Sequence, residues 1–241
     1  MKNLTSTLLF LFGISLAHGQ ESDKLKPFTK IIAGPHIALT LENGPDERIQ
    51  IKSNGLEEDK IIYFVKGDKL HIHLRDARNF EKQRKVRRGS GKWKTGMYND
   101  IVVHAHVTYR NLEKLVTKGE QDITVNGSIQ GKRFKYKSFG DQDVEFANLE
   151  TNIFRAKLYG TTNLKIKKGK TEYQRYKLYG EHDIDVQNVN AKKVSAASFG
   201  DLDLEVNSDL VLLTSFGTAR IDSRKPAVIR KGIVIGETSI N

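Results

Sequence analysis

The chain reads Tyr179-Gly180-Glu181-His182-Asp183-Ile184-Asp185-Val186 and, 20 residues later, Phe199-Gly200-Asp201-Leu202-Asp203-Leu204-Glu205-Val206. Each stretch has an aromatic residue, a glycine, two variable residues, an aspartate and then apolar residues at alternating positions. With local departures, the pattern recurs at spacings of 21, 20, 20, 20 and 17 residues, centred on Gly119, Gly140, Gly160, Gly180, Gly200 and Gly217. A repeat this regular predicts a stack of similar structural units.

The alternation of apolar residues within each unit has period two, which is typical of β-strands and not of helices. Glycine between the strands allows a bend that a bulky residue would resist. One unit cannot enclose a core, but stacked units bury continuous apolar columns. The predicted columns are Ile123, Val144, Leu164, Ile184 and Leu204, and beside them Val125, Phe146, Ile166, Val186 and Val206. The fold class expected is therefore all-β, a parallel β-helix with coils of roughly 20 residues.

Upstream of the repeats, four further apolar segments alternate with turn signals such as Asn43-Gly44-Pro45 and Asn54-Gly55. These segments lack the 20-residue period, so we expect an N-terminal sheet or irregular coils that cap the open end of the stack. The predicted division is an N-terminal β region over 20–117 and a repeat β-helix over 118–241. The predicted strands lie at 37–41, 48–51, 61–65 and 69–74.

The first residues predict export. Lys2 precedes the apolar run 8–16, and Ala17 and Gly19 stand at the minus-three and minus-one positions of a cleavage site. We expect a signal peptide over 1–19 and a mature chain from Gln20, in the periplasm, at the cell surface or secreted. The sequence contains no cysteine, which excludes disulfides, thiolate metal sites and a lipoprotein anchor. No later run is apolar and long enough to span a membrane.

The chain has 40 Lys and Arg against 29 Asp and Glu, and much of this excess is local. Between Arg75 and Lys94 there are nine basic and two acidic residues, without strand alternation. This segment predicts a basic loop over 76–99, either a solvated connection or a contact for an anionic surface. Nucleic acid is not an expected partner for an exported protein.

The chain resembles the bacterial family described as putative auto-transporter adhesin, head GIN domain. The resemblance rests on 28–37, on 102–115, on the Gly-x-x-Asp-apolar repeats, and on Lys225-Pro226-Ala227-Val228 with Gly232. It implies a right-handed parallel β-helix and a role outside the cytoplasm. It says little about which ligand is bound or whether any reaction is catalysed. Here Phe or Tyr precedes the corner glycine, where the family often has Ser-Gly-Ser-Gly.

Strand alternation before the corner glycine assigns basic and aromatic residues to one outward strip. At about 4.8 Å per rung, these residues predict two cationic ladders beside an aromatic ladder, suited to acidic or stacked sugar rings. The alternative is that the aromatic residues stack only on one another and fix the register of the rungs, covered by the Lys and Arg stems. The candidate ligand residues are Lys135, Lys137, Phe139, Arg155, Lys157, Tyr159, Arg175, Lys177, Tyr179, Phe199 and Phe216.

Two other patterns of residues are candidate sites. Rows of acidic residues after the corner (Asp143, Asp183 and Asp203, with Glu145, Asp185 and Glu205) are compatible with a polysaccharide lyase or hydrolase, although catalytic acids are singular and repeated Asp more often supports turns. His71 with His73 and His104 with His106 each share one strand face, which permits zinc or copper if the two strands pair. Solvent-facing histidines are the alternative.

The sequence thus favours an exported, non-catalytic protein that binds a glycan, an envelope component or a partner protein through a repeat face. An enzyme acting on acidic polysaccharide and a purely structural envelope scaffold are the alternatives. No cofactor or catalytic residue is predicted.

Overall fold

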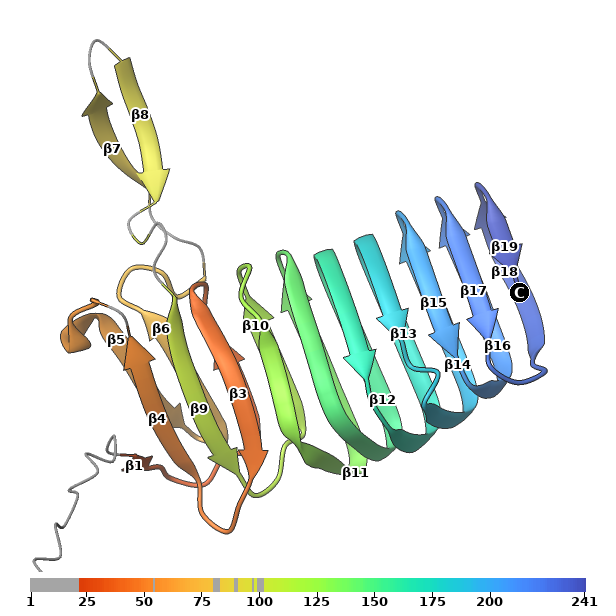
Figure 1. The fold of residues 1–241 in the computed structure, drawn as a ribbon, viewed down its shortest axis with the longest axis horizontal. Coiled ribbons are helices and arrows are strands. Elements are labelled where there is room, and N and C mark those ends of the chain that lie inside the picture. Colours follow the sequence, from red (N-terminus) through yellow and green to blue (C-terminus); the bar gives the residue numbers. More distant parts are fainter. Residues whose placement is uncertain (1–21, 54, 80–82, 89–90, 97, 99–101) are drawn as a thin grey trace, which may run out of the picture.

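The computed structural model describes residues 22–53, 55–79, 83–88, 91–96, 98 and 102–241. Its strands stack along one axis into an elongated parallel β-helix, as predicted (Figure 1). The predicted signal peptide lies outside the described residues. The one helical segment in the described part is the 3-10 turn η1 (Glu58–Lys60). The strands are β1 (Asp23–Lys24), β2 (Lys30–Ala33), β3 (Ile37–Asn43), β4 (Arg48–Ser53), β5 (Ile61–Lys66), β6 (Lys69–Leu74), β7 (Gln83–Arg88), β8 (Gly91–Gly96), β9 (Val103–Tyr109), β10 (Lys114–Lys118), β11 (Ile123–Phe139), β12 (Gln142–Ile166), β13 (Gly169–Asp185), β14 (Val189–Phe199), β15 (Leu202–Val206), β16 (Ser208–Phe216), β17 (Ala219–Ser223), β18 (Val228–Ile235) and β19 (Thr238–Ile240).

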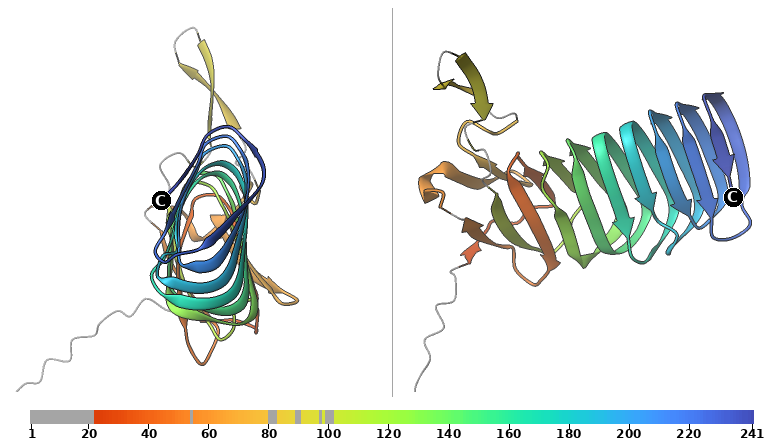
Figure 2. Two further views of the ribbon diagram at one scale, coloured as in Figure 1. Left: turned by 90° about the vertical axis from the view of Figure 1, so that its right-hand side faces the viewer. Right: turned by 45° about the horizontal axis from the view of Figure 1, so that its top comes forward.

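Each coil contributes to two opposed faces, which give the flattened outline seen end-on (Figure 2). The strand segments before the corner glycine form what we call the pre-corner face, and those after it form the post-corner face. Along the pre-corner face, parallel pairing runs β6–β2–β10–β11–β12–β13–β14–β16–β18. Along the post-corner face it runs β9–β3–β11–β12–β13–β15–β17–β19. Long strands such as β12 pass through the corner and belong to both faces.

The corner requires glycine for two separate reasons. Gly180 has φ +123°, a conformation that residues with a side chain rarely adopt. A Cβ atom at Gly180 would also stand 2.1 Å from the carbonyl oxygen of Gly160 in the preceding coil. The same geometry recurs at Gly236, where a Cβ would stand 2.2 Å from the Gly217 carbonyl oxygen. The glycine series therefore extends one coil further than the sequence repeat indicated.

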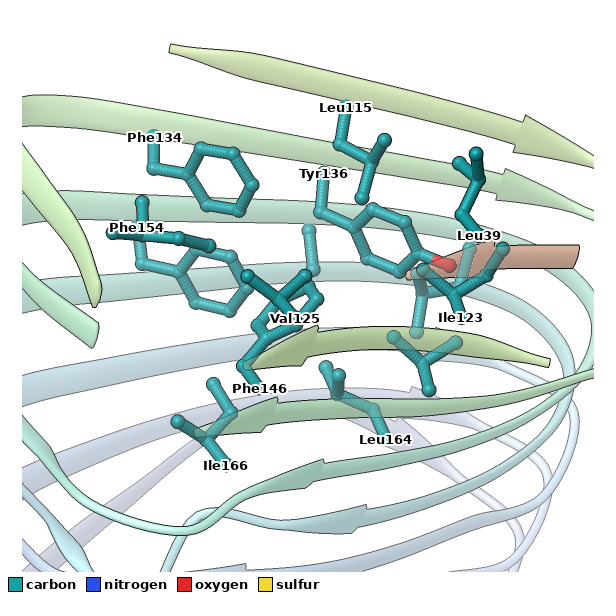
Figure 3. Close-up of a cluster of buried hydrophobic side chains, with 14 of the residues drawn as sticks. Leu39, Leu115, Ile123, Val125, Phe134, Tyr136, Phe146, Phe154, Leu164 and Ile166 are labelled. Carbon is teal, nitrogen blue, oxygen red and sulfur yellow. The ribbon is translucent and has the colours of Figure 1, made fainter. Parts of the chain in front are cut away.

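Both predicted apolar columns are buried between the two faces. The register pairs Leu164 with Ile184 and Ile184 with Leu204, so these side chains stack on successive rungs. Aromatic side chains from the two faces meet in the interior, where the rings of Phe134 and Phe146 pack edge to face with centroids 5.8 Å apart (Figure 3). Outward side chains on the two faces consequently point to opposite sides of the molecule.

At the N-terminal end, the stacking order departs from the chain order. β2 pairs with β10 on one side and with β6 on the other, and β3 likewise lies between β11 and β9. The coil of β2 and β3 is thus inserted between coils that follow it in sequence, and strands on both sides of residue 117 share one sheet. The antiparallel strands β4 and β5 pair with β9 and β6 and close this end, as expected of an N-terminal cap.

The basic segment over 76–99 is not simply the loop that we predicted. Within it, β7 and β8 form a separate antiparallel hairpin whose register sets Val86 opposite Trp93. Each strand has only this one apolar residue, so the alternation that identifies strands in a sequence was absent.

Candidate binding face

The structure places the predicted cations of the pre-corner face in two straight rows. The register pairs Lys135 with Arg155 and Arg155 with Arg175 on successive strands. It does the same for Lys137, Lys157 and Lys177. Because parallel strands lie about 4.8 Å apart, each row sets like charges one rung from the next.

The first row is twice as long as the sequence indicated. Lys114 on β10 pairs with Lys135, Lys30 on β2 pairs with Lys114, and Lys69 on β6 pairs with Lys30. We call the two rows together the basic face, which comprises Lys69, Lys30, Lys114, Lys135, Arg155 and Arg175 in the first row and Lys137, Lys157 and Lys177 in the second. Sequence reasoning missed the first three because their strands lack the 20-residue period and do not stack in chain order.

Within the described residues, most cations of the basic face have no acidic partner. Lys30 is the exception, with its Nζ 2.5 Å from a carboxylate oxygen of Asp68. No ion pair joins Lys135, Arg155 or Arg175 to any carboxylate in the part of the chain that the structure describes. Burial lowers the pKa of Lys114, and repulsion from Lys135, Lys137 and other nearby lysines lowers it further. The face therefore carries concentrated positive charge that the protein itself does not neutralise.

The predicted aromatic ladder is a continuous stack beside the second row. Centroids of neighbouring rings are 5.0, 4.9, 5.2 and 4.9 Å apart, and the rings are within 9° of parallel. The members, in order, are Phe139, Tyr159, Tyr179, Phe199 and Phe216.

Lysines from the second row lie over this stack. Lys137 Nζ is 4.4 Å from the ring centroid of Phe139, and Lys157 Nζ is 5.0 Å from that of Tyr159. A hydrogen bond with Tyr159 raises the pKa of Lys157. These are cation–π distances, so the ammonium groups are held at the ladder by the rings.

This geometry changes what the aromatic ladder can do. Each interior ring of the stack, from Tyr159 to Phe199, has neighbouring rings on both faces, so a sugar ring cannot lie flat on Tyr159 or Tyr179 without separating two rungs. Only ring edges point outward, and the most exposed, Phe199, has a relative exposure of 45%. The ladder thus has the geometry of a register-fixing element, and the cations are the groups of this strip that face solvent with free charge for a candidate ligand.

The acidic rows lie on the opposite, post-corner face. Several of their members have partners: Asp203 pairs with Arg220 at 3.2 Å, Asp185 with Lys165 at 2.8 Å, and Glu145 with Lys167 at 2.6 Å. Asn163 donates a hydrogen bond to Asp143. The carboxylates that support turns are the ones directly after the corner glycine, since Asp141 accepts the backbone N–H of Thr161 and Asp201 that of Thr218. Repeated and largely paired carboxylates of this kind do not isolate one acid and one base for catalysis.

The two histidine pairs do not come together. His71 and His73 lie on β6, which pairs with β2 and β5. His104 and His106 lie on β9, which pairs with β3 and β4. The ring of His71 stacks on Phe64 at 5.0 Å, and His106 Nε2 is 3.2 Å from Glu42. Across the described residues, no group of three or more His, Cys, Asp or Glu side chains is arranged to hold a metal ion. The strands that carry the two histidine pairs therefore do not form the pairing that a shared zinc or copper site would need.

Comparison with known proteins places this fold in a defined family. A family model described as "Putative auto-transporter adhesin, head GIN domain" matches residues 27–215. No curated protein matches the sequence. Within the described residues, no helix is long and apolar enough to cross a membrane.

Solved structures share the fold at low sequence identity. A putative adhesin from Bacteroides fragilis superposes with a TM-score of 0.63 at 18% identity, covering 92% of this chain and 95% of its own. A putative adhesin from Parabacteroides merdae gives 0.58 at 13% identity, covering 91% and 93%. A protein titled putative lipid binding protein, from Parabacteroides distasonis, gives 0.53 at 13% identity, covering 92% and 94%. At these identities the likeness concerns the fold alone.

Proposed function

This chain belongs to the family of putative auto-transporter adhesins with a head GIN domain, and we propose that it is an exported, non-catalytic protein that binds a polyanionic envelope component. The ligand has negative groups repeated along its length, as in an acidic polysaccharide or the phosphorylated headgroups of a glycolipid layer. The proposed site is the basic face. Export is supported by the sequence of residues 1–19 and by the family.

The observation that carries the proposal is the six-rung row from Lys69 to Arg175, in register and mostly without carboxylate partners. Two unit charges about 4.8 Å apart repel by roughly 1 kcal/mol even in a water-like dielectric, and by several times more near a protein surface. An anionic group bridging two rungs offsets that repulsion with two attractions. The row runs along the axis of the β-helix, so a linear polymer lying along it meets a cation at every rung.

Arg155 and Arg175 add geometric selectivity to the row. A guanidinium presents a planar fork of donors that matches carboxylate, sulfate and phosphate oxygens, whereas a lysine acts as a point charge. Mixed Lys and Arg along one row therefore suit an extended anionic chain better than a single compact anion. The aromatic ladder, which lies beside the second row, fixes the register of the rungs.

The test is affinity electrophoresis of the mature chain from Gln20 in gels containing an acidic polysaccharide, polygalacturonate, or a neutral one, dextran. Flotation with phosphatidylglycerol vesicles tests binding to phosphorylated lipid headgroups. Reducing ends are assayed in the polysaccharide samples. We expect retardation by polygalacturonate or binding to vesicles, no effect of dextran, and no new reducing ends. New reducing ends would support the enzyme alternative, and the absence of all binding would leave the scaffold alternative.

A matched pair of variants separates the basic face from net charge. The triple variant Lys135→Gln, Arg155→Gln and Arg175→Gln removes three charges from the first row. Its control, Lys168→Gln, Lys170→Gln and Lys192→Gln, removes three from exposed positions outside the basic face. We expect binding to fall at least tenfold in the first variant only. Equal losses would mean that diffuse positive charge, and not this face, binds the ligand.

A further inference from the structure

The proposed function leaves the opposite side of the molecule unused, and that side has the opposite charge. Toward the C-terminal coils, six carboxylates gather on β13, β15 and β17 or beside them, with Lys165 and Arg220 as their ion-pair partners. We call this surface the acidic face, defined by Asp183, Asp185, Asp201, Asp203, Glu205 and Asp222.

The negative charge of this face is crowded. The register stacks Asp183 on Asp203, Asp185 on Glu205, and Glu205 on Asp222. Burial raises the pKa of Asp183, and so do the neighbouring carboxylates of Asp203 and Asp185. Glu205 has its pKa raised for the same reasons, burial first and then Asp185. Like charges therefore accumulate here as they do on the basic face, with the sign reversed.

The basic and acidic faces match each other in spacing. Both are built from the same coils, so their charges recur at the same rise along the axis, about 4.8 Å per rung. They differ in axial position, because the first basic row spans β6, β2, β10, β11, β12 and β13, and the acidic face spans β13, β15 and β17. They also point to opposite sides, since the interior rings pack between the two faces. One molecule cannot bring its own two faces together.

We propose that the acidic face of one copy of this chain docks on the basic face of a second copy, side by side and staggered along the axis. The repeat distances agree because both surfaces come from one coil geometry, so a shift by whole rungs preserves the pairing of charges. Complementary patches of this kind steer association and set its register more than they add affinity.

The arrangement of the faces dictates the form of the assembly. A two-fold dimer uses the same patch on both subunits, but here the complementary patches lie on opposite sides of each subunit. The contact is therefore heterologous and leaves a free basic face at one end and a free acidic face at the other. Such contacts continue into open chains unless the rotation between subunits closes a ring. A polyanion that occupies the basic face competes with this contact and shortens the chains.

The test is sedimentation velocity of the mature chain over a range of concentrations, at about 0.01 M and at about 1 M salt, where the screening length falls from about 30 Å to about 3 Å. We expect concentration-dependent growth of mass at low salt and a monomer at high salt. A monomer at low salt across the whole range would overturn the proposal.

Two half-blocked variants test the pairing itself. Variant one, Lys135→Gln, Arg155→Gln and Arg175→Gln, weakens the basic face and leaves the acidic face unchanged. Variant two, Asp183→Asn, Asp185→Asn and Glu205→Gln, weakens the acidic face and leaves the basic face unchanged. Asparagine already occupies the position of Asp183 one coil earlier, at Asn163, so the substitution fits the rung. We expect each variant alone to be monomeric and their mixture to form a one-to-one complex. Mixtures that remain monomeric, or variants that still self-associate, would contradict the proposal.

A control variant, Glu57→Gln, Glu58→Gln and Glu150→Gln, removes three carboxylates away from the acidic face and should assemble like the parent chain. The result of these assembly experiments does not depend on whether the basic face binds a polyanion. Variant two keeps the basic face and should still bind polygalacturonate if that proposal holds, whether or not the parent chain assembles.

Discussion

Gly180 lies so close to Gly160 in the preceding coil that a Cβ atom on Gly180 would stand 2.1 Å from the Gly160 carbonyl oxygen. Gly131 also has a positive φ, +137°, but a Cβ there would meet nothing within 4 Å. Comparing Gly131 with Gly180 therefore separates the energetic cost of an unfavourable backbone conformation from that of a steric clash with the neighbouring coil. The corner glycine is thus a steric requirement of stacking as well as a flexible turn residue.

We expect Gly131→Ala to lower the free energy of unfolding by about 1–3 kcal/mol, the range for a residue held in a sparsely populated backbone region. Gly180→Ala should lower it by clearly more, because the backbone of two coils must also move apart. Urea titration followed by circular dichroism measures both. Equal losses in the two variants would show that the close approach to Gly160 carries no energy of its own.

The aromatic ladder leads to a prediction about its role. Tyr179 stacks between Tyr159 and Phe199, and an aromatic pair contributes about 0.5–1.5 kcal/mol beyond burial of area. Tyr179→Ala should therefore lower the free energy of unfolding by about 1–3 kcal/mol and leave retardation by polygalacturonate unchanged. The control is Tyr173→Ala, which removes an outward tyrosine of the same face beside Lys193, outside the ladder. Loss of binding without loss of stability would make the ring edges part of the ligand site.

Much of this architecture could be predicted because the repeat is local. One period places Lys135 on Arg155 and Phe139 on Tyr159, and the alternation within a strand decides which side chains point inward. The same reasoning could not align Lys69, Lys30 and Lys114, because β2 is inserted between β6 and β10 and no period links those strands. Nor could it show that the aromatic rings stack face to face, because the spacing of residues in the sequence does not determine side-chain rotamers.

Acid should destabilise the protein through His182, which lies inside the β-helix between the rungs of Thr162 and Leu202. Burial lowers the pKa of His182 from 6.5 to about 4. The unfolded chain therefore takes up a proton before the folded chain does. Stability from the neutral imidazole is complete above about pH 6.5 and is lost as the pH falls toward 4, by up to about 3 kcal/mol.

His182→Leu, which repeats the residue one rung further on, should remove this loss. Asp183 and Glu205 act in the opposite sense, because a raised carboxyl pKa makes the folded state gain stability as the pH falls. The parent chain and the variant are compared by urea titration at pH 7.5, 5.5 and 4.5. Parallel pH profiles would mean that His182 is not the group responsible.

The inserted N-terminal coil should matter more to stability than the last coil. Ile31 on β2 is fully buried, and its strand is held between β6 and β10. Ile229 on β18 is only partly buried at the end of the stack, where β18 pairs with no other described strand than β16. In a solenoid each coil contacts only its neighbours, so a buried charge at an end frays one coil, whereas one between two coils removes two interfaces.

We therefore expect Ile31→Asp to abolish cooperative unfolding of the N-terminal half, or folding altogether, and Ile229→Asp to leave β10–β16 intact. Hydrogen exchange read by mass spectrometry distinguishes the two, because loss of protection should spread from β2 to β6 and β10 in the first variant and remain within β18 and β19 in the second. If Ile31→Asp cannot be isolated folded, the milder Ile31→Ala, with a loss of about 2–5 kcal/mol, tests the same order against Ile229→Ala. If loss of protection spreads equally far in both variants, the stack unfolds as one unit and the inserted coil contributes no more to stability than the last one.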